Sequence, residues 1–150
     1  MANRQIIGIV MKVTIEIVIE APIKTIWEAW VTPEDITQWN FAIEEWCCPS
    51  AKIDFVEGGN FNYRMEAKDG SFGFDFKGEF THITLHKLIQ YSLEDGRMVM
   101  IEFIDSNNGV KVVQTFDTED ENSAEQQRQG WLGILTNFKT HVEEHSVNVR

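Results

Sequence analysis

Two histidines near the end of the sequence have the spacing of a metal-binding pair. The segment His141-Val142-Glu143-Glu144-His145 matches the H-x-x-E-H pattern of some zinc peptidases, in which imidazoles four residues apart share one ion. Only five residues follow His145, which leaves no room for the downstream ligand that such enzymes need. A helix C-terminus also favours histidine through its dipole. We therefore expect a structural role for this pair and no metal site.

Two further pairs of potential ligands have unsuitable geometry. His82 and His86 lie in strand-like sequence, where four residues of extended chain separate them by roughly 13 Å, too far for one ion. Cys47 and Cys48 are adjacent, and adjacent cysteines rarely form a relaxed disulfide. No second cysteine pair exists to complete a zinc site. We expect a reducing, cytoplasmic location and no cofactor, and the role of the two thiols stays open.

Residues for acid–base or nucleophilic catalysis are equally hard to find. The sequence has no Ser-His-Asp order, phosphate-binding glycine loop or nucleotide fingerprint, and Asp75 and Glu79 fall on the polar side of their strand. No residue is therefore assigned a catalytic role. The formal charge of −11, from 24 acidic and 13 basic residues, argues against nucleic acid and anionic membranes as partners.

No segment is apolar over a sufficient length to enter a membrane. The apolar stretch from Ile6 to Met11 has six residues, whereas a membrane helix needs about 20 and a signal peptide needs a longer apolar region with a cleavage site. We expect no membrane insertion. Met1 and Met11 are both candidates for the physiological start.

The spacing of apolar residues predicts one strand followed by two short helices. Alternate residues between Lys12 and Glu20 are apolar, which indicates a half-buried strand. Pro22 marks the first helix start, because proline is tolerated in a first helical turn. The segment Thr32-Pro33-Glu34-Asp35 marks the second, with Thr32 as the capping residue and two acids in the first turn.

Turn signals are dense between about Ala51 and Asp117. The pairs that favour hairpin turns are Gly58-Gly59, Asp69-Gly70, Asp95-Gly96 and Asn108-Gly109. Apolar residues alternate with polar ones in the runs between these pairs. This arrangement predicts an antiparallel meander of about six strands.

The period then changes to that of a helix. Ser123 and Gln126 form a capping-box pattern. The apolar stripe that follows consists of Trp131, Ile134, Leu135, Phe138 and Val142. We expect a helix of about 20 residues, roughly 30 Å long, which can cross the sheet. Gly130 and Gly133 each cost about 1 kcal/mol there relative to alanine, so they mark either a close approach of the helix to the sheet or a ligand, or a tolerated defect.

A series of short motifs runs through the sequence: Ala21-Pro22, Ile26-Trp27, Thr32-Pro33-Glu34, Trp39, Gly58-Gly59-Asn60-Phe61, Asp69-Gly70, Gly78-Glu79-Phe80 and Gly130-Trp131-x-x-Ile134-Leu135-x-x-Phe138. Together they resemble the heat-shock ATPase-activator-homologue family of the START-like, helix-grip superfamily. The resemblance covers residues 12–144 of what we expect to be a single domain, 1–150. It implies an α+β fold in which an antiparallel sheet of about six to seven strands wraps a long C-terminal helix, with two short helices after strand 1.

The inward faces of such a sheet and helix would enclose an apolar cavity. The residues expected to bind a ligand there are Trp46, Phe61, Tyr63, Phe74, Phe76, Tyr91, Ile101, Phe103, Gln114, Trp131, Leu135 and Phe138. Each ring has core packing as its alternative role. Gln114 is polar on an inward face, so it either orients a polar group of the ligand, makes a structural hydrogen bond, or turns outward by a register shift. Trp46 belongs to a loop expected at the cavity mouth.

We expect the protein to bind a small hydrophobic molecule, such as a lipid, polyketide or aromatic metabolite. The superfamily also includes cyclases, hydrolases and co-chaperone modules on one scaffold, so the fold alone does not decide between functions. The alternatives are a cyclase- or hydrolase-type enzyme that uses the same cavity, and a protein-interaction module with an unidentified protein partner.

Overall fold

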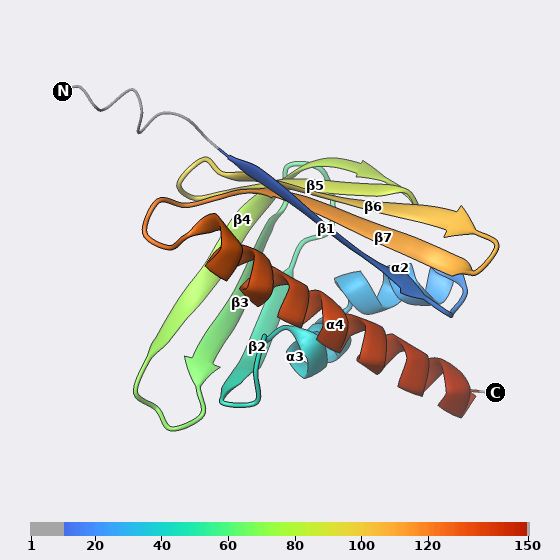
Figure 1. The fold of residues 1–150 in the computed structure, drawn as a ribbon, viewed down its shortest axis with the longest axis horizontal. Coiled ribbons are helices and arrows are strands. Elements are labelled where there is room, and N and C mark those ends of the chain that lie inside the picture. The colour runs from blue at the N-terminus through green and yellow to red at the C-terminus, as the bar shows by residue number, and fades with distance from the viewer. Residues whose placement is uncertain (1–10, 150) are drawn as a thin grey trace.

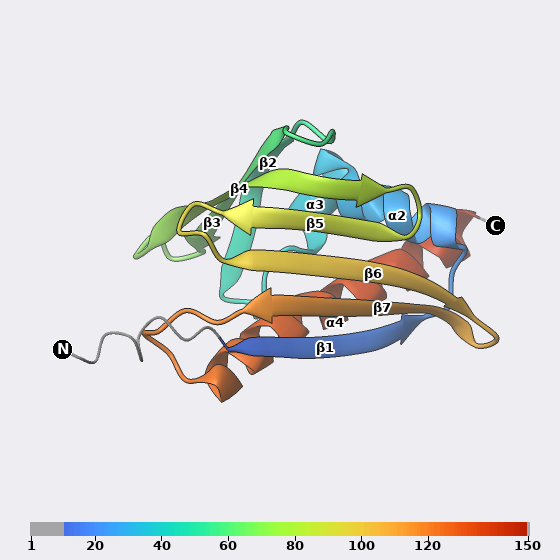
Figure 2. The same ribbon diagram turned by 90° about the horizontal axis from the view of Figure 1, so that it is seen from above.

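The computed structural model of the chain describes residues 11–149, with side chains described as far as residue 145. Within this part, seven antiparallel strands form one sheet in the order β1-β7-β6-β5-β4-β3-β2 (Figure 2). The elements are β1 (Lys12–Ile19), α2 (Ile23–Val31), α3 (Pro33–Trp39), β2 (Trp46–Ile53), β3 (Asn60–Ala67), β4 (Gly73–Thr84), β5 (Leu88–Leu93), β6 (Met98–Ser106), β7 (Gly109–Asp117) and α4 (Ala124–Val149). The predicted α+β helix-grip fold is confirmed. The choice between Met1 and Met11 concerns residues 1–10, which lie outside the described residues.

Alternating burial along the strands gives the sheet one face that packs inside the molecule. In β7 the inward residues are Val110, Val112, Gln114 and Phe116. The turns between strands place glycine in the left-handed region, with φ of 92° at Gly96 and 123° at Gly109. Only glycine adopts these angles without strain, so the predicted turns at Asp95-Gly96 and Asn108-Gly109 are confirmed.

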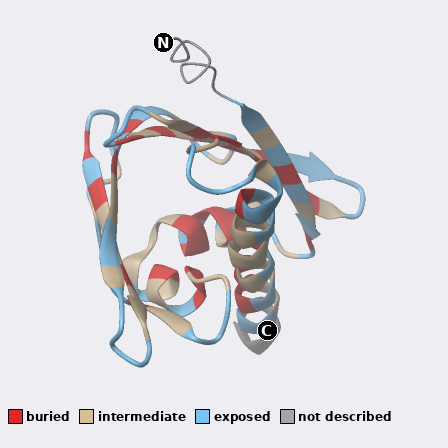
Figure 3. Ribbon diagram, turned by 60° about the vertical axis from the view of Figure 1, so that its left-hand side comes forward, coloured by how far each residue is buried: buried red, intermediate tan, exposed pale blue. Residues whose placement is uncertain are grey.

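The sheet is strongly coiled because two strands contain irregularities. The β4–β5 register shifts between Phe80 and His82, and the β2–β3 register shifts between Cys47 and Ser50. A shift of this kind bends a strand and increases its twist. The strands β2, β3 and the first half of β4 therefore turn away from the layer of β1 and β5–β7, and β2 runs beside α3 (Figure 1). Figure 3 shows the resulting curl around the helices.

Strand β2 differs from the sequence-based prediction. It begins at Trp46 and includes Pro49, whereas the turn signals place the first strand of the meander near Ala51. Proline cannot donate to a strand ladder and is tolerated on edge strands and at bulges. Both conditions hold here, because β2 is the last strand of the sheet and its register shifts around Pro49.

The two short helices are confirmed, and Thr32 takes the N-cap position of α3, but its hydroxyl makes no capping hydrogen bond there. Its hydroxyl donates to the carbonyl of Glu28 at 2.6 Å and so closes the last turn of α2. The helices pack through an aromatic cluster, in which the Trp30 and Trp39 rings are 5.0 Å apart between centroids. The indole Nε1 of Trp39 also donates to the carbonyl of Ala29 at 3.0 Å. These contacts fix α3 against α2.

The helix α4 starts with the predicted capping box. The Ser123 hydroxyl accepts from the Gln126 amide at 3.1 Å, and the Gln126 side-chain oxygen accepts from the Ser123 amide at 3.2 Å. The helix has 26 residues instead of the expected 20 or so. His141 therefore lies inside the helix, not at its end, and its Nε2 is 2.8 Å from Asp35 Oδ1 on α3. The Nδ1 of His145 lies 2.8 Å from the carbonyl oxygen of His141.

The two glycines of α4 have different surroundings. A Cβ added at Gly133 would lie 3.1 Å from the carbonyl oxygen of Ala42, whereas one added at Gly130 would meet nothing within 4 Å. Gly133 is therefore closely approached, but by the loop of residues 40–45 and not by the sheet. At Gly130 the expected close approach to the sheet is wrong.

We expect Gly130→Ala to raise the free energy of unfolding by about 0.5–1 kcal/mol, because alanine loses less conformational entropy in a helix and meets no obstacle here. Gly133→Ala is the matched control, since the same gain is offset by contact with Ala42. Urea denaturation of both variants measures the difference. A loss of stability in Gly130→Ala would contradict the packing of this helix turn.

Candidate functional site

A cavity of about 280 Å³ lies between the inner face of the sheet and the helices. Its lining residues come from both short helices, from four strands, from three loops and from α4. They are Trp30, Trp39, Asn40, Tyr63, Met65, Phe74, Phe76, Phe80, Tyr91, Arg97, Gln114, Glu119, Gln127, Trp131 and Ile134. Eight of these fifteen residues are aromatic, so most of the wall is apolar.

Six of the twelve predicted ligand-binding residues line this cavity: Tyr63, Phe74, Phe76, Tyr91, Gln114 and Trp131. Trp131 forms the helix side of the wall and stacks on Phe116 of β7, with ring centroids 4.2 Å apart and planes 8° from parallel. Phe76 meets Trp131 edge-on at 6.2 Å. The sheet and α4 therefore meet through aromatic rings, two of which, Phe76 and Trp131, also line the cavity.

The other six predicted residues lie elsewhere. Five are buried in the packed core, with exposed fractions of 4% or less: Phe61, Ile101, Phe103, Leu135 and Phe138. Trp46 packs edge-on against Phe72 and Phe74 at 5.8 and 6.0 Å, outside the cavity lining. An inward position on a strand or helix does not show whether a ring fills the core or lines the cavity. For this reason the sequence-based prediction included residues that do not line the cavity.

Nine lining residues were not among those predicted: Trp30, Trp39, Asn40, Met65, Phe80, Arg97, Glu119, Gln127 and Ile134. Ile134 belongs to the apolar stripe of α4, and Met65 alternates with Tyr63 on β3, so the sequence does contain a signal for both. Arg97 and Glu119 lie in loops, where no periodicity indicates the direction of a side chain.

The two tyrosines of the lining carry uncharged hydroxyls. Burial raises the pKa of Tyr63 well above its ordinary value, and the neighbouring Tyr91 raises it further. Burial also raises the pKa of Tyr91. An ionised phenolate would be poorly solvated inside the protein, so both hydroxyls stay protonated near neutral pH.

Charged groups gather at the end of the cavity where Arg97 lies. The Nε of Arg97 donates to Asp95 Oδ2 at 2.8 Å. Asp117 accepts from Lys12 Nζ at 2.6 Å and from the Met98 amide at 2.8 Å. Burial alone would raise the pKa of Asp117, but Lys12, the Met98 amide and Arg97 together hold it below its ordinary value. These contacts tie the ends of β1, β6 and β7 together beside the cavity.

Glu119 and Gln127 close the same end. The carboxylate of Glu119 accepts from the Asn122 side chain at 2.7 Å and from the backbone amides of Glu121 and Asn122 at 2.6 and 2.9 Å. The Gln127 side chain accepts from the Glu119 amide at 2.9 Å and donates to the Glu119 and Asn122 carbonyls at 3.0 and 2.8 Å. Both side chains hold the loop before α4 in place.

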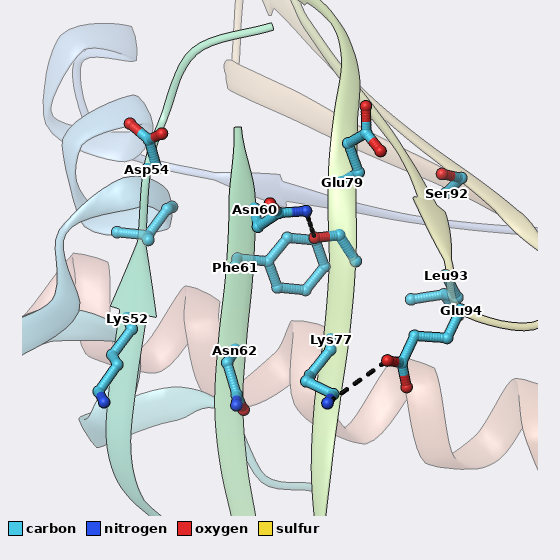
Figure 4. A pocket seen from close by; sticks show the side chains of 12 residues that line it. Lys52, Asp54, Asn60, Phe61, Asn62, Lys77, Glu79, Ser92, Leu93 and Glu94 are labelled. Atoms are coloured by element: carbon cyan, nitrogen blue, oxygen red, sulfur yellow. Dashed lines mark hydrogen bonds and ion pairs between the residues drawn. The ribbon is translucent and has the colours of Figure 1, made fainter. Parts of the chain in front are cut away.

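A second, larger depression of about 700 Å³ lies on the outer face of β2–β5 (Figure 4). Lys52, Asn62 and Lys77 lie in a row across three strands, and Lys77 Nζ is 3.4 Å from Glu94 Oε2. Among the described residues, Oδ1 of Asn62 is the one enclosed side-chain nitrogen or oxygen without a hydrogen-bond partner. The groove is open and lined by charged groups, so an apolar molecule gains less there than in the inner cavity.

The thiols and imidazoles do not form a metal centre in the described part of the chain. Cys47 and Cys48 are free, and burial raises the pKa of the Cys48 thiol. Residues 11–145 contain no group of three or more histidine, cysteine or acidic side chains arranged to hold a metal. Among the described helices, none has the length and apolar character needed to span a membrane.

Comparison with known proteins identifies the family. Residues 20–143 match the family model described as activator of Hsp90 ATPase homolog 1-like protein. The solution structure of an AHSA1-like protein from Aeromonas hydrophila is 42% identical, with a TM-score of 0.85 over 90% of this chain and 94% of that one. A Cytophaga hutchinsonii protein is 39% identical, with a TM-score of 0.78 over 89% of this chain and 93% of its own.

A more distant structure shares the fold alone. A Nitrosomonas europaea protein is 16% identical, with a TM-score of 0.78 over 91% of this chain and 97% of that one. A search of curated proteins finds no match. The match over residues 20–143 and the two closely similar structures agree with each other, and the chain belongs to the activator of Hsp90 ATPase homolog 1-like family of the START-like superfamily.

Proposed function

We propose that the protein binds a small, mainly apolar molecule in the cavity between the sheet and α4. The observation that carries this proposal is the wall of eight aromatic residues around a space of about 280 Å³. Dry apolar cavities of about 150 Å³ bind benzene, and sites for drug-sized ligands begin at about 300 Å³. The size therefore favours a ligand with about two fused rings over a long-chain lipid.

The energy available from burial is sufficient for measurable affinity. A ligand that buries about 200 Å² of apolar surface gains roughly 5 kcal/mol before the costs of association. No acid–base pair stands beside the ligand space among the fifteen lining residues. Their one carboxylate, Glu119, is occupied by the hydrogen bonds of its own loop. No specific contact favours the cyclase or hydrolase alternative over simple binding.

Naphthalene is a suitable probe, and Phe74→Glu is the informative variant. Phe74 lines the cavity and is 42% exposed, so glutamate there can keep its charge in water without unfolding the protein. We expect saturable 1:1 binding to the wild type and at least about tenfold weaker binding to Phe74→Glu, equivalent to about 1.4 kcal/mol. Two-dimensional NMR titration measures both dissociation constants and reports folding at the same time.

The matched control is Phe72→Glu. Phe72 contacts Phe74 at 6.2 Å between ring centroids but does not line the cavity, and it is 61% exposed. Its replacement adds the same charge to the same hairpin, and we expect the affinity for naphthalene to change less than about twofold, since the cavity wall stays intact. Absence of saturable binding to the folded wild type, or an equal loss in both variants, would refute the proposal.

A further inference from the structure

Among the described residues, three buried side chains with an amide or hydroxyl group border the cavity without a hydrogen-bond partner. They are Gln114, Tyr63 and Tyr91, with exposed fractions of 5%, 8% and 7%. No hydrogen bond links the Gln114 amide or either tyrosine hydroxyl to another group of residues 11–145. Buried polar groups in native proteins are almost always paired, so such a set calls for an explanation.

The unpaired atoms belong to residues that line the cavity and are not fully enclosed by protein. Within the described residues, Asn62 Oδ1 is the one side-chain nitrogen or oxygen that is both fully enclosed and unpartnered, and it lies on the outer face of the sheet. The amide of Gln114 and the hydroxyls of Tyr63 and Tyr91 must therefore keep their small accessible surface. Because these residues line the cavity, that surface is open to a molecule inside it.

The charged groups near the cavity already have partners, and the carboxylate of Glu119 is held by amides of its own loop. Arg97 is paired with Asp95, and Asp117 is paired with Lys12. An ionised ligand group would have to leave water and compete for these partners, which costs several kcal/mol when no free counter-charge is present. A neutral hydroxyl or carbonyl loses much less solvation and can pair with an amide or a phenol.

Building on the proposed function, we propose that the ligand carries an uncharged hydroxyl or carbonyl group on an apolar body, and that Gln114 and the two tyrosine hydroxyls receive this group. Gln114 offers both a donor and an acceptor, so it can pair with either kind of oxygen. The tyrosine hydroxyls serve as neutral donors. A carboxylate or an ammonium of the same shape is rejected.

Three probes with the same ring system test this preference near neutral pH: naphthalene, 2-naphthol and 2-naphthoate. We expect 2-naphthol to bind about tenfold more tightly than naphthalene, as one hydrogen bond to a buried amide allows, and 2-naphthoate to bind at least tenfold more weakly than 2-naphthol. Isothermal titration calorimetry or NMR titration gives all three dissociation constants. If 2-naphthoate binds as tightly as 2-naphthol, the proposal is wrong.

Gln114→Leu removes the amide at nearly constant volume. We expect this variant to lose most of the preference for 2-naphthol over naphthalene, leaving about twofold or less, because leucine offers no hydrogen bond to the hydroxyl. Gln90→Leu is the matched control, because Gln90 precedes Tyr91 on β5, belongs to the half-buried outward side of that strand and does not line the cavity. It should leave both affinities unchanged.

Tyr91→Phe and Tyr63→Phe provide the second route to the same result if Gln114→Leu fails to fold. A preference for 2-naphthol that survives intact in all three variants would overturn the assignment of these groups. Naphthalene separates the two proposals: if it binds and 2-naphthol shows no preference, only this inference fails. If no probe binds to the folded protein, the proposed function fails.

Discussion

Replacing Phe138 by alanine is expected to lower the free energy of unfolding by about 3–5 kcal/mol, the usual cost of truncating a fully buried ring. Phe138 has 0% exposure, and its ring lies 4.8 Å from both Trp30 and Trp39 between centroids. It joins α4 to the two short helices. Urea denaturation monitored by far-ultraviolet circular dichroism measures the effect.

Phe72→Ala is the control for that experiment. It removes the same ring from a position that is 61% exposed, so we expect a change within about 0.5 kcal/mol. Comparable losses in the two variants would mean that α4 is not held by the aromatic cluster, contrary to the structure.

The second large effect is expected at Gly78, in the middle of β4. A Cβ added there would lie 2.5 Å from the Ser92 carbonyl oxygen and 2.7 Å from the Phe61 ring. The backbone oxygen cannot move away without breaking the sheet, so we expect Gly78→Ala to cost about 2–3 kcal/mol, in the upper range for overpacking. Displacement of Phe61 would also disturb Tyr63 and Tyr91, whose rings are each 4.8 Å away, and thus weaken naphthalene binding.

Gly73→Ala tests whether the loss of stability depends on which group the added Cβ contacts. Its added Cβ would first meet the Nη2 of Arg64 at 2.6 Å, the flexible end of a side chain. Because that group can swing aside, we expect a smaller loss than in Gly78→Ala. Denaturant unfolding of both variants gives the comparison, and a greater loss at Gly73 would contradict the tight packing described for β4.

The parts of the fold that the sequence predicts well depend on short-range chemistry. The capping box at Ser123 and Gln126 and the Asn108-Gly109 turn need only local hydrogen bonds and glycine at a positive φ, and both are found as predicted. Alternation along β7 likewise identifies Gln114 as inward-facing before any tertiary contact is known. These signals are sufficient for the order of elements, whereas the helix-grip arrangement is implied by the family resemblance.

The cavity lining depends on how strongly the sheet curls, and no local pattern encodes that. The shift between Phe80 and His82 bends β4 and brings Phe74 and Phe76 toward α4, while Phe103, on the flatter part of the sheet, packs into the core. Arg97 reaches the cavity from a loop. The sequence therefore predicts which side chains of a strand point inward. It does not predict which of these side chains line the cavity.

The distribution of indole rings gives the protein an internal reporter. Trp30, Trp39 and Trp131 border the cavity, whereas Trp27 and Trp46 do not. Trp30 and Trp39 are also close enough to each other, at 5.0 Å, for their electronic transitions to couple. Occupation of the space should therefore change the near-ultraviolet dichroic bands and the emission maximum of the unlabelled chain, so that chemical libraries can be screened optically without attaching a dye.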